Sequence, residues 1–211
     1  MNTLRSSFAA SGVFLMLTLA SCTPKETRLL LEPSQALGAV LAAETVHVAG
    51  AKKSVILIVP KWAANSAVGE SFKAALKKQG VNIAFTLSAD TGDPMGRDLI
   101  GLKSADFFSA LEKSASAGAI VSLAGAPFLN DQDVARLGSD HPPVLVVATS
   151  SLGEVMGIPG NRPYLAGLLK AKIIQLAIVD GELESASQVS EKLDANQQLF
   201  AQHYRILRNS D

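Results

Sequence analysis

The chain has 211 residues, and its 19 Lys and Arg residues balance its 19 Asp and Glu residues, so the formal net charge is zero. Binding to nucleic acid needs clustered Lys and Arg, and no basic block stands out in the sequence, so we expect no nucleic-acid partner. Hydrophobic residues make up 48% of the chain and aromatic residues only 5%, a composition typical of an α/β domain with a sizeable core.

The N-terminus has the pattern of a bacterial signal peptide. An uncharged apolar run from Phe8 to Ala20 follows Arg5, and it is too short to cross the roughly 30 Å core of a bilayer. The run leads into "LASC", which ends in Cys22, the only cysteine. This order resembles the lipobox of bacterial lipoproteins, in which the thiol is acylated and the signal peptide is cut just before it. We therefore expect residues 1–21 to be a lipoprotein signal peptide, and an ordinary Sec signal cleaved after Ser21 is the alternative.

An acylated Cys22 predicts a chain that is tethered to membrane lipid in the bacterial envelope. Each buried methylene contributes about 0.8 kcal/mol, so several acyl chains of palmitate length hold a protein on a bilayer almost irreversibly. In bacterial lipoproteins an Asp after the cysteine favours the inner membrane, and the residue here is Thr23. For a Gram-negative cell we therefore expect the outer membrane, with the protein facing the periplasm. Residues 22–33 are predicted to be the lipidated N-terminus and a spacer.

Residues 34–211 are predicted to form a single α/β domain. A helix is expected over residues 34–48, with Ser34 as its cap. The segment "SVILIVP", residues 54–60, is a continuous apolar run, which is typical of a strand buried on both faces of a parallel sheet. A helix over residues 69–79 ends at Gly80, and the strand "VNIAFTL" follows over residues 81–87.

The same alternation continues toward the C-terminus. Further helices are predicted over residues 104–117, 130–137, 163–171 and 182–200, with Asn130 as a cap and Pro163 in a first turn. Further strands are predicted over residues 119–125, 143–149 and 173–179, and "YRIL" at 204–207 is a candidate edge strand. This alternation predicts a five-stranded parallel doubly wound sheet in a three-layer αβα sandwich, with the flavodoxin-like order 2-1-3-4-5. Six residues are expected to be buried in that sheet: Ile56, Ile58, Ile83, Val121, Val146 and Ile178.

Several segments resemble one lobe of the type I periplasmic binding proteins, the sugar-type substrate-binding proteins. "LGAVLAAE", "KKSVILIVP" and "GESFKAALKKQGVNIAFTL" follow one another as a helix, a buried strand, a helix and a Gly-Val-x-Ile entry into the second strand. "SASAGAIVSLAGAP" and "HPPVLVVATS" resemble later units of the same lobe, so the resemblance covers residues 36–181. The family has two lobes that close on a ligand, whereas this chain has length for one. The resemblance therefore implies a binding protein without a cofactor, whose cleft a homodimer or another protein would complete.

Candidate ligand-binding side chains follow the predicted strands at their carboxyl ends, where open parallel sheets bind ligands. Trp62 is the only tryptophan; it would stack on an apolar ligand face while Asn65 and Asp90 bind polar groups. The alternatives are a tryptophan packed on a neighbouring helix, and Asn65 or Ser66 acting only as a helix cap. The full candidate set is Lys61, Trp62, Asn65, Ser66, Asp90, Asn130 and Thr149.

The sequence predicts neither a metal site nor a complete catalytic site. Asp90, Asp93 and Asp98 lie close together, but their spacing is not that of a calcium loop. Ser150 and Ser151 follow a predicted strand, yet "ATSSLG" lacks the Gly-x-Ser-x-Gly nucleophile elbow.

The three histidines give no support to an enzyme either, since the sequence places none of His47, His141 and His203 beside a serine. We therefore predict a non-enzymatic, lipid-anchored envelope binding protein that serves uptake or sensing of a polar small molecule or contacts an envelope protein. A structural or scaffolding envelope lipoprotein without a small-molecule ligand is the alternative, and a serine hydrolase is a third hypothesis.

Overall fold

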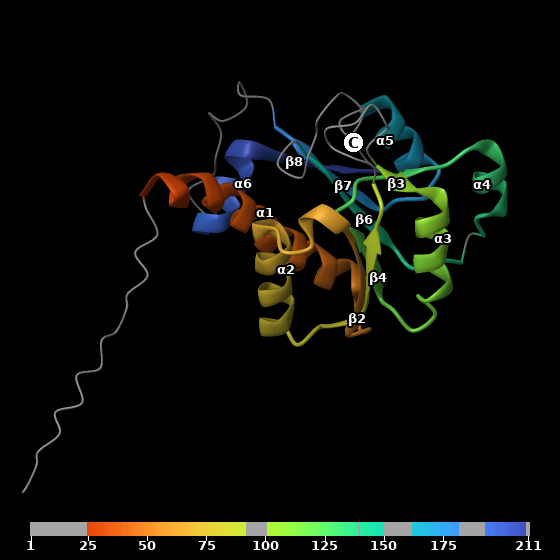
Figure 1. Cartoon of the computed structure of the whole chain (residues 1–211), viewed down its shortest axis with the longest axis horizontal. Coiled ribbons are helices and arrows are strands. Elements are labelled where there is room, and N and C mark those ends of the chain that lie inside the picture. The colour runs from red at the N-terminus through yellow and green to blue at the C-terminus, as the bar shows by residue number, and fades with distance from the viewer. Residues whose placement is uncertain (1–24, 92–100, 139, 150–161, 182–192, 210–211) are drawn as a thin grey trace, which may run out of the picture.

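The computed structural model describes residues 25–91, 101–138, 140–149, 162–181 and 193–209, which form a three-layer αβα sandwich (Figure 1). The central sheet has the order β2-β1-β4-β6-β7-β8. Its first five strands are parallel and β8 is antiparallel to β7. The predicted order 2-1-3-4-5 is thus confirmed, and the candidate edge strand at the C-terminus adds a sixth strand. The sheet strands are β1 (Ser54–Pro60), β2 (Asn82–Ala89), β4 (Ala119–Ser122), β6 (Val144–Ala148), β7 (Leu176–Asp180) and β8 (Tyr204–Arg208).

Helices cover both faces of this sheet, and two shorter strands pair beside it. The strands β3 (Leu102–Lys103) and β5 (Pro127–Phe128) form a small parallel sheet of their own. The helices are α1 (Lys25–Ala49), α2 (Ala67–Lys78), α3 (Ser104–Glu112), α4 (Asp131–Arg136), α5 (Arg162–Lys170) and α6 (Ala195–His203), and a 3-10 turn, η1 (Lys61–Ala63), follows β1. None of the described helices is both long enough and apolar enough to cross a membrane.

The core has two halves, one on each face of the sheet. Alternate residues of the buried strands point to opposite faces, so Leu57 packs with α1 and α2 while Ile58 packs with α3 and α5. Of the six residues that were expected in the core, Ile56, Ile58, Val121, Val146 and Ile178 are at most 1% exposed. Ile83 is only half-buried. It lies on β2, which pairs with β1 alone in the described part of the chain, so that strand is covered less than the central ones.

Helices α1 and α2 approach each other closely because a buried glycine lies between them. A Cβ atom added to Gly38 would lie 2.4 Å from the carbonyl oxygen of Val68 and 2.8 Å from the backbone nitrogen of Phe72. The Ser71 hydroxyl crosses the same contact and donates to the carbonyl of Gln35 at 2.7 Å. The two helices together cover one face of β1. The candidate site directly follows the end of this strand.

The N-terminal helix is longer than predicted. We expected a spacer up to residue 33 and a helix that starts at Ser34, but α1 begins at Lys25 and contains Pro33. A proline removes one backbone donor and crowds the preceding turn, which is why it predicts a helix end. In this helix the turns on both sides of Pro33 nevertheless remain α-helical.

Other predicted boundaries were wrong by a few residues, among them the end of the strand predicted over 119–125, which stops at Ser122. Helix α3 ends at Glu112 rather than at 117, because the Ser114 hydroxyl donates to the Leu111 carbonyl at 2.6 Å and a turn follows. The strand predicted from Ile173 begins at Leu176, because the backbone of Ile173 instead donates to Leu168 in the turn after α5. The predicted helix over 182–200 is described only from residue 193, and α6 accounts for its last part.

Candidate functional site

The candidate site lies where the parallel strands end. Strand order reverses between β1 and β4, because the chain leaves β1 toward β2 on one side and leaves β4 toward β6 on the other. In doubly wound sheets the crevice outside the carboxyl ends of the strands at such a reversal is the usual ligand site. Here η1 follows β1 without a gap, and Pro60, whose φ is −62°, is both the last residue of β1 and the residue that precedes the turn.

Trp62 is held at this edge by a contact between two loops. Its indole Nε1 donates to the Oγ1 of Thr91 at 3.1 Å. Thr91 follows β2 and is only 2% exposed, whereas Trp62 is 43% exposed. One edge of the ring is therefore fixed to the protein while much of its apolar surface faces solvent. Large exposed aromatic surface that is held in place is well suited to stack on a ligand or partner.

Lys61 and Asp90 directly follow the neighbouring strands β1 and β2. The β1–β2 ladder ends with the pair Pro60 and Ala89, so Lys61 and Asp90 are the first residues beyond the same end of the two strands. Both side chains are exposed. The Asp90 carboxylate also lies 3.6 Å from the Nζ of Lys103, an exposed ion pair of the kind that stabilises a fold little. This edge thus carries the indole of Trp62 together with two cations, Lys61 and Lys103, and the carboxylate of Asp90.

Two other candidates act as helix caps. The Ser66 hydroxyl accepts a hydrogen bond from the backbone N–H of Gly69 at the start of α2. Asn130 and Asp133 form a reciprocal capping box at the start of α4, in which the Asn130 side chain accepts from the Asp133 backbone at 2.9 Å. Such contacts satisfy backbone N–H groups that a helix leaves unpaired. The capping alternative considered for Ser66 is therefore the arrangement in the structure.

The last two candidates differ in exposure. Asn65 is exposed in the turn before α2, beside the Trp62 loop. Thr149 directly follows β6 but is only 2% exposed, so its side chain belongs to the interior of this edge. The structure thus brings Lys61, Trp62 and Asp90 together at the ends of β1 and β2, whereas Asn130 caps the start of α4.

Three further residues shape this edge, and the sequence analysis did not single them out. Thr91 positions the tryptophan, and Ser122 closes the turn after β4, where its hydroxyl donates to the Gly125 carbonyl at 2.7 Å. The Tyr164 hydroxyl ties α5 to the small sheet, since it donates to the Pro127 carbonyl at 2.6 Å and accepts from the Leu129 N–H at 3.2 Å. Only the position of Thr91 just after a predicted strand could have pointed to such a role.

The catalytic and metal hypotheses fall partly outside the described residues. Asp93, Asp98, Ser150 and Ser151 lie outside them. Across the described ranges no group of three or more His, Cys, Asp and Glu side chains could hold a metal ion. The Nδ1 of His141 lies 2.9 Å from the carbonyl oxygen of Pro142, close to where β6 begins.

Comparison with known proteins identifies the fold. A chain of the XylFII–LytSN complex superposes with a TM-score of 0.51 at 12% identity, over 84% of this chain and 60% of that one. An ABC transporter substrate-binding protein from Desulfitobacterium hafniense, in complex with Leu, gives a TM-score of 0.40 at 11% identity, over 79% of this chain and 41% of that one. The chain therefore spans less than two thirds of the length of either neighbour. No protein-family model and no curated protein matches the sequence.

Proposed function

We propose that this chain is a non-enzymatic binding protein whose ligand or partner contacts the carboxyl-end edge of the sheet at Trp62. The observation that carries the proposal is the anchored, 43% exposed indole at the reversal of strand order. Two further features support it: the sequence resembles one lobe of the type I periplasmic binding proteins, and the fold is shared with a chain of the XylFII–LytSN complex. The side chains of Lys61 and Asp90 would bind polar or charged groups of a ligand whose apolar face stacks on Trp62.

A ligand screen by thermal shift tests this proposal. A molecule that binds the folded state alone raises the melting temperature in proportion to RT ln(1 + [L]/Kd), so the shift grows with ligand concentration. We expect at least one member of a panel of sugars, amino acids and small organic anions to give such a dose-dependent shift in the native chain. The same shift should be lost or reduced in Trp62→Ala. If no member of the panel stabilises the protein, the scaffolding alternative is favoured.

The open edge also predicts how a ligand would be enclosed. The chain covers 60% of the first structural neighbour, and Trp62 faces solvent on an open surface. We propose that a second copy or another envelope protein supplies the opposing surface. Sedimentation velocity with and without a stabilising ligand distinguishes the two. Ligand-dependent dimerisation favours the second copy, and a monomer that binds with unchanged mass favours a different partner.

We also propose that Cys22 anchors the protein in a bacterial membrane, with the outer membrane favoured by Thr23. The proposal rests on the lipobox-like sequence before Cys22. Fractionation of cells that express Cys22→Ala tests it, and Cys22→Ser is a second variant. We expect the variant to leave the membrane fraction or to accumulate as an uncleaved precursor. A variant that fractionates as a mature membrane protein would contradict lipidation.

A further inference from the structure

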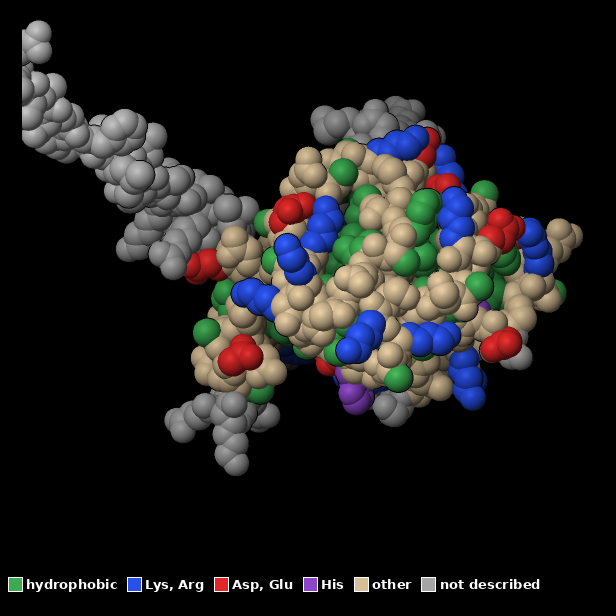
Figure 2. All heavy atoms as spheres, turned by 90° about the horizontal axis from the view of Figure 1, so that it is seen from below, with side chains coloured by type: hydrophobic (Ala, Val, Ile, Leu, Met, Phe, Trp, Pro, Cys, Tyr) green, Lys and Arg blue, Asp and Glu red, His purple; other side chains and the backbone are tan. Residues whose placement is uncertain are grey.

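A second surface with binding chemistry lies at the opposite edge, where β1, β2 and β4 begin. Six exposed cationic side chains surround it and are called the basic edge: Lys52, Lys53, Lys77, Lys78, Lys113 and Arg136. Figure 2 looks onto this edge from below Figure 1 and shows Lys and Arg side chains spread across it. These side chains come together because α2, α3 and α4 all end at this edge, and helix C-termini stabilise cationic side chains.

Among the described residues, no carboxylate pairs with any of these six cations. In the described part of the chain Lys73 pairs with Glu70, Lys103 with Asp90 and Arg208 with Glu44, and no ion pair there involves the basic edge. Two members contact aromatic rings instead. Arg136 lies 4.4 Å from the centre of the Phe108 ring and Lys113 lies 4.2 Å from that of Phe85.

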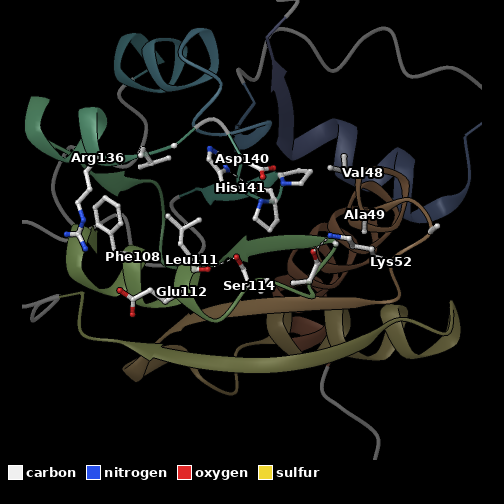
Figure 3. Close-up of a pocket in the computed structure, with 18 residues that line it drawn as sticks. Val48, Ala49, Lys52, Phe108, Leu111, Glu112, Ser114, Arg136, Asp140 and His141 are labelled. Atoms are coloured by element: carbon white, nitrogen blue, oxygen red, sulfur yellow. Dashed lines mark hydrogen bonds between the residues drawn. The ribbon is translucent and has the colours of Figure 1, made fainter.

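A groove of about 860 Å³ runs between two of these cations. Its walls come from the end of α1, from α3 and from residues 136–138 and 140–143 between α4 and β6. In Figure 3 Arg136 stands over Phe108 at one end and Lys52 lies at the other, with Leu111 between them. Pro142 and Pro143 add apolar lining. The groove therefore has a cation at each end and apolar surface in the middle.

Both terminal cations keep donors that the protein does not use. The Lys52 ammonium donates to the Ala117 carbonyl at 3.3 Å, and an ammonium has two further N–H donors. The guanidinium carbon of Arg136 lies over the Phe108 ring, and among the described residues no acceptor takes its N–H groups. A guanidinium carries five N–H donors and can bind a carboxylate with two of them in parallel. Each end of the groove therefore has N–H donors that can bind an anionic group.

We propose that this groove binds an acidic peptide segment of a partner protein, with carboxylates at Arg136 and Lys52 and aliphatic side chains over Leu111. A flat bilayer would not enter a concave groove, and the large exposed hydrophobic side chains of the described residues, Trp62 and Val134, do not line it.

A uniform polyanion fits the groove less well than such a peptide. Glu112 and Asp140 also line the groove, so a chain with evenly spaced phosphates would bring like charges together. Arg136 already lies over the Phe108 ring, so a base that stacked on that face would have to displace the guanidinium. A peptide whose two carboxylates are separated by apolar residues avoids both conflicts.

Labelled synthetic peptides test this proposal by fluorescence anisotropy. The probes carry two Glu residues separated by a variable number of Ala, Val and Leu residues, and matched probes carry Lys in place of Glu. We expect the acidic probes of one spacing to bind most tightly, with an affinity that falls as salt rises. Reversal of either terminal charge, in Lys52→Glu or Arg136→Glu, should weaken binding about tenfold or more, a change of about 1.4 kcal/mol. The paired change of Lys77→Glu and Lys78→Glu, on the same edge but outside the groove, should weaken it much less.

Several results would overturn the proposal. If the groove variants and the Lys77 and Lys78 control lost peptide affinity to the same extent, the peptides would be attracted to the whole basic edge and not bound in the groove. Equal binding of the Lys-ended probes, or no binding of any probe at low salt, would reject an acidic peptide. Phosphatidylglycerol vesicles or single-stranded DNA that bind through Lys52 and Arg136 while the peptides do not would identify another class of partner. Because the groove lies at the opposite edge from Trp62, Trp62→Ala should leave peptide binding unchanged, which separates this test from that of the proposed ligand site.

Discussion

The close contact between α1 and α2 predicts that Gly38→Ala destabilises the protein, although alanine is the better helix former. The added methyl would lie 2.4 Å from the Val68 carbonyl oxygen and 2.8 Å from the Phe72 nitrogen. Both are backbone atoms, so a whole helix must shift. Overpacking of this kind costs about 3 kcal/mol at the upper end of its usual range, and the gain in helix propensity offsets about 1 kcal/mol. We expect a net loss of about 2 kcal/mol.

Gly167→Ala provides the matched control for this prediction. Gly167 lies on an exposed face of α5, and a Cβ atom placed there would meet nothing within 4 Å. The same chemical change should therefore stabilise the protein by about 0.5–1 kcal/mol. Urea unfolding followed by far-UV circular dichroism gives both values. If Gly38→Ala were as stable as the native chain while Gly167→Ala gained stability, the packing of α1 on α2 described above would be wrong.

Two further predictions concern the core and the position of Trp62. Ile58 is fully buried, so Ile58→Ala should lower the free energy of unfolding by about 2–5 kcal/mol, and a loss below 1 kcal/mol in urea unfolding would argue against a buried central strand. Thr91→Val removes the acceptor for the Trp62 indole, so we expect lower fluorescence anisotropy of Trp62 and a loss of about 0.5–1.5 kcal/mol in the free energy of unfolding. Thr91→Ser should restore both values. Unchanged anisotropy in Thr91→Val would mean that Thr91 does not hold the ring.

The central strands could be predicted because they are buried on both faces. A strand such as β1 has neighbours on both sides and helices above and below, so its sequence is a short, continuous apolar run rich in β-branched residues, which favours a buried strand. The edge strand β2 was harder to place in the core, because half of its side chains face solvent. Helix ends depended on single contacts, such as the Ser114 hydroxyl on Leu111, which hydrophobic periodicity does not encode.

The candidate site could be predicted only as a set of loops. The rule for parallel sheets places Lys61, Trp62 and Asp90 at one edge, and the structure brings these three together. The partner of Trp62 could not be predicted, because the contact with Thr91 depends on the register between β1 and β2. The basic edge was missed for a related reason. Its lysines occur singly or in pairs along the sequence and come together only because several helices end at one edge.

The most direct test of the account is a calorimetric titration of a stabilising ligand into the native chain and into Trp62→Ala, with Trp62 emission followed in parallel. Since Trp62 is the only tryptophan, any change in emission reports on this edge alone. We expect the ligand to change the intensity or wavelength of that emission and to bind Trp62→Ala at least about tenfold more weakly, a loss of about 1.4 kcal/mol. A ligand that binds both proteins equally well by calorimetry and leaves the emission unchanged would place the binding site elsewhere.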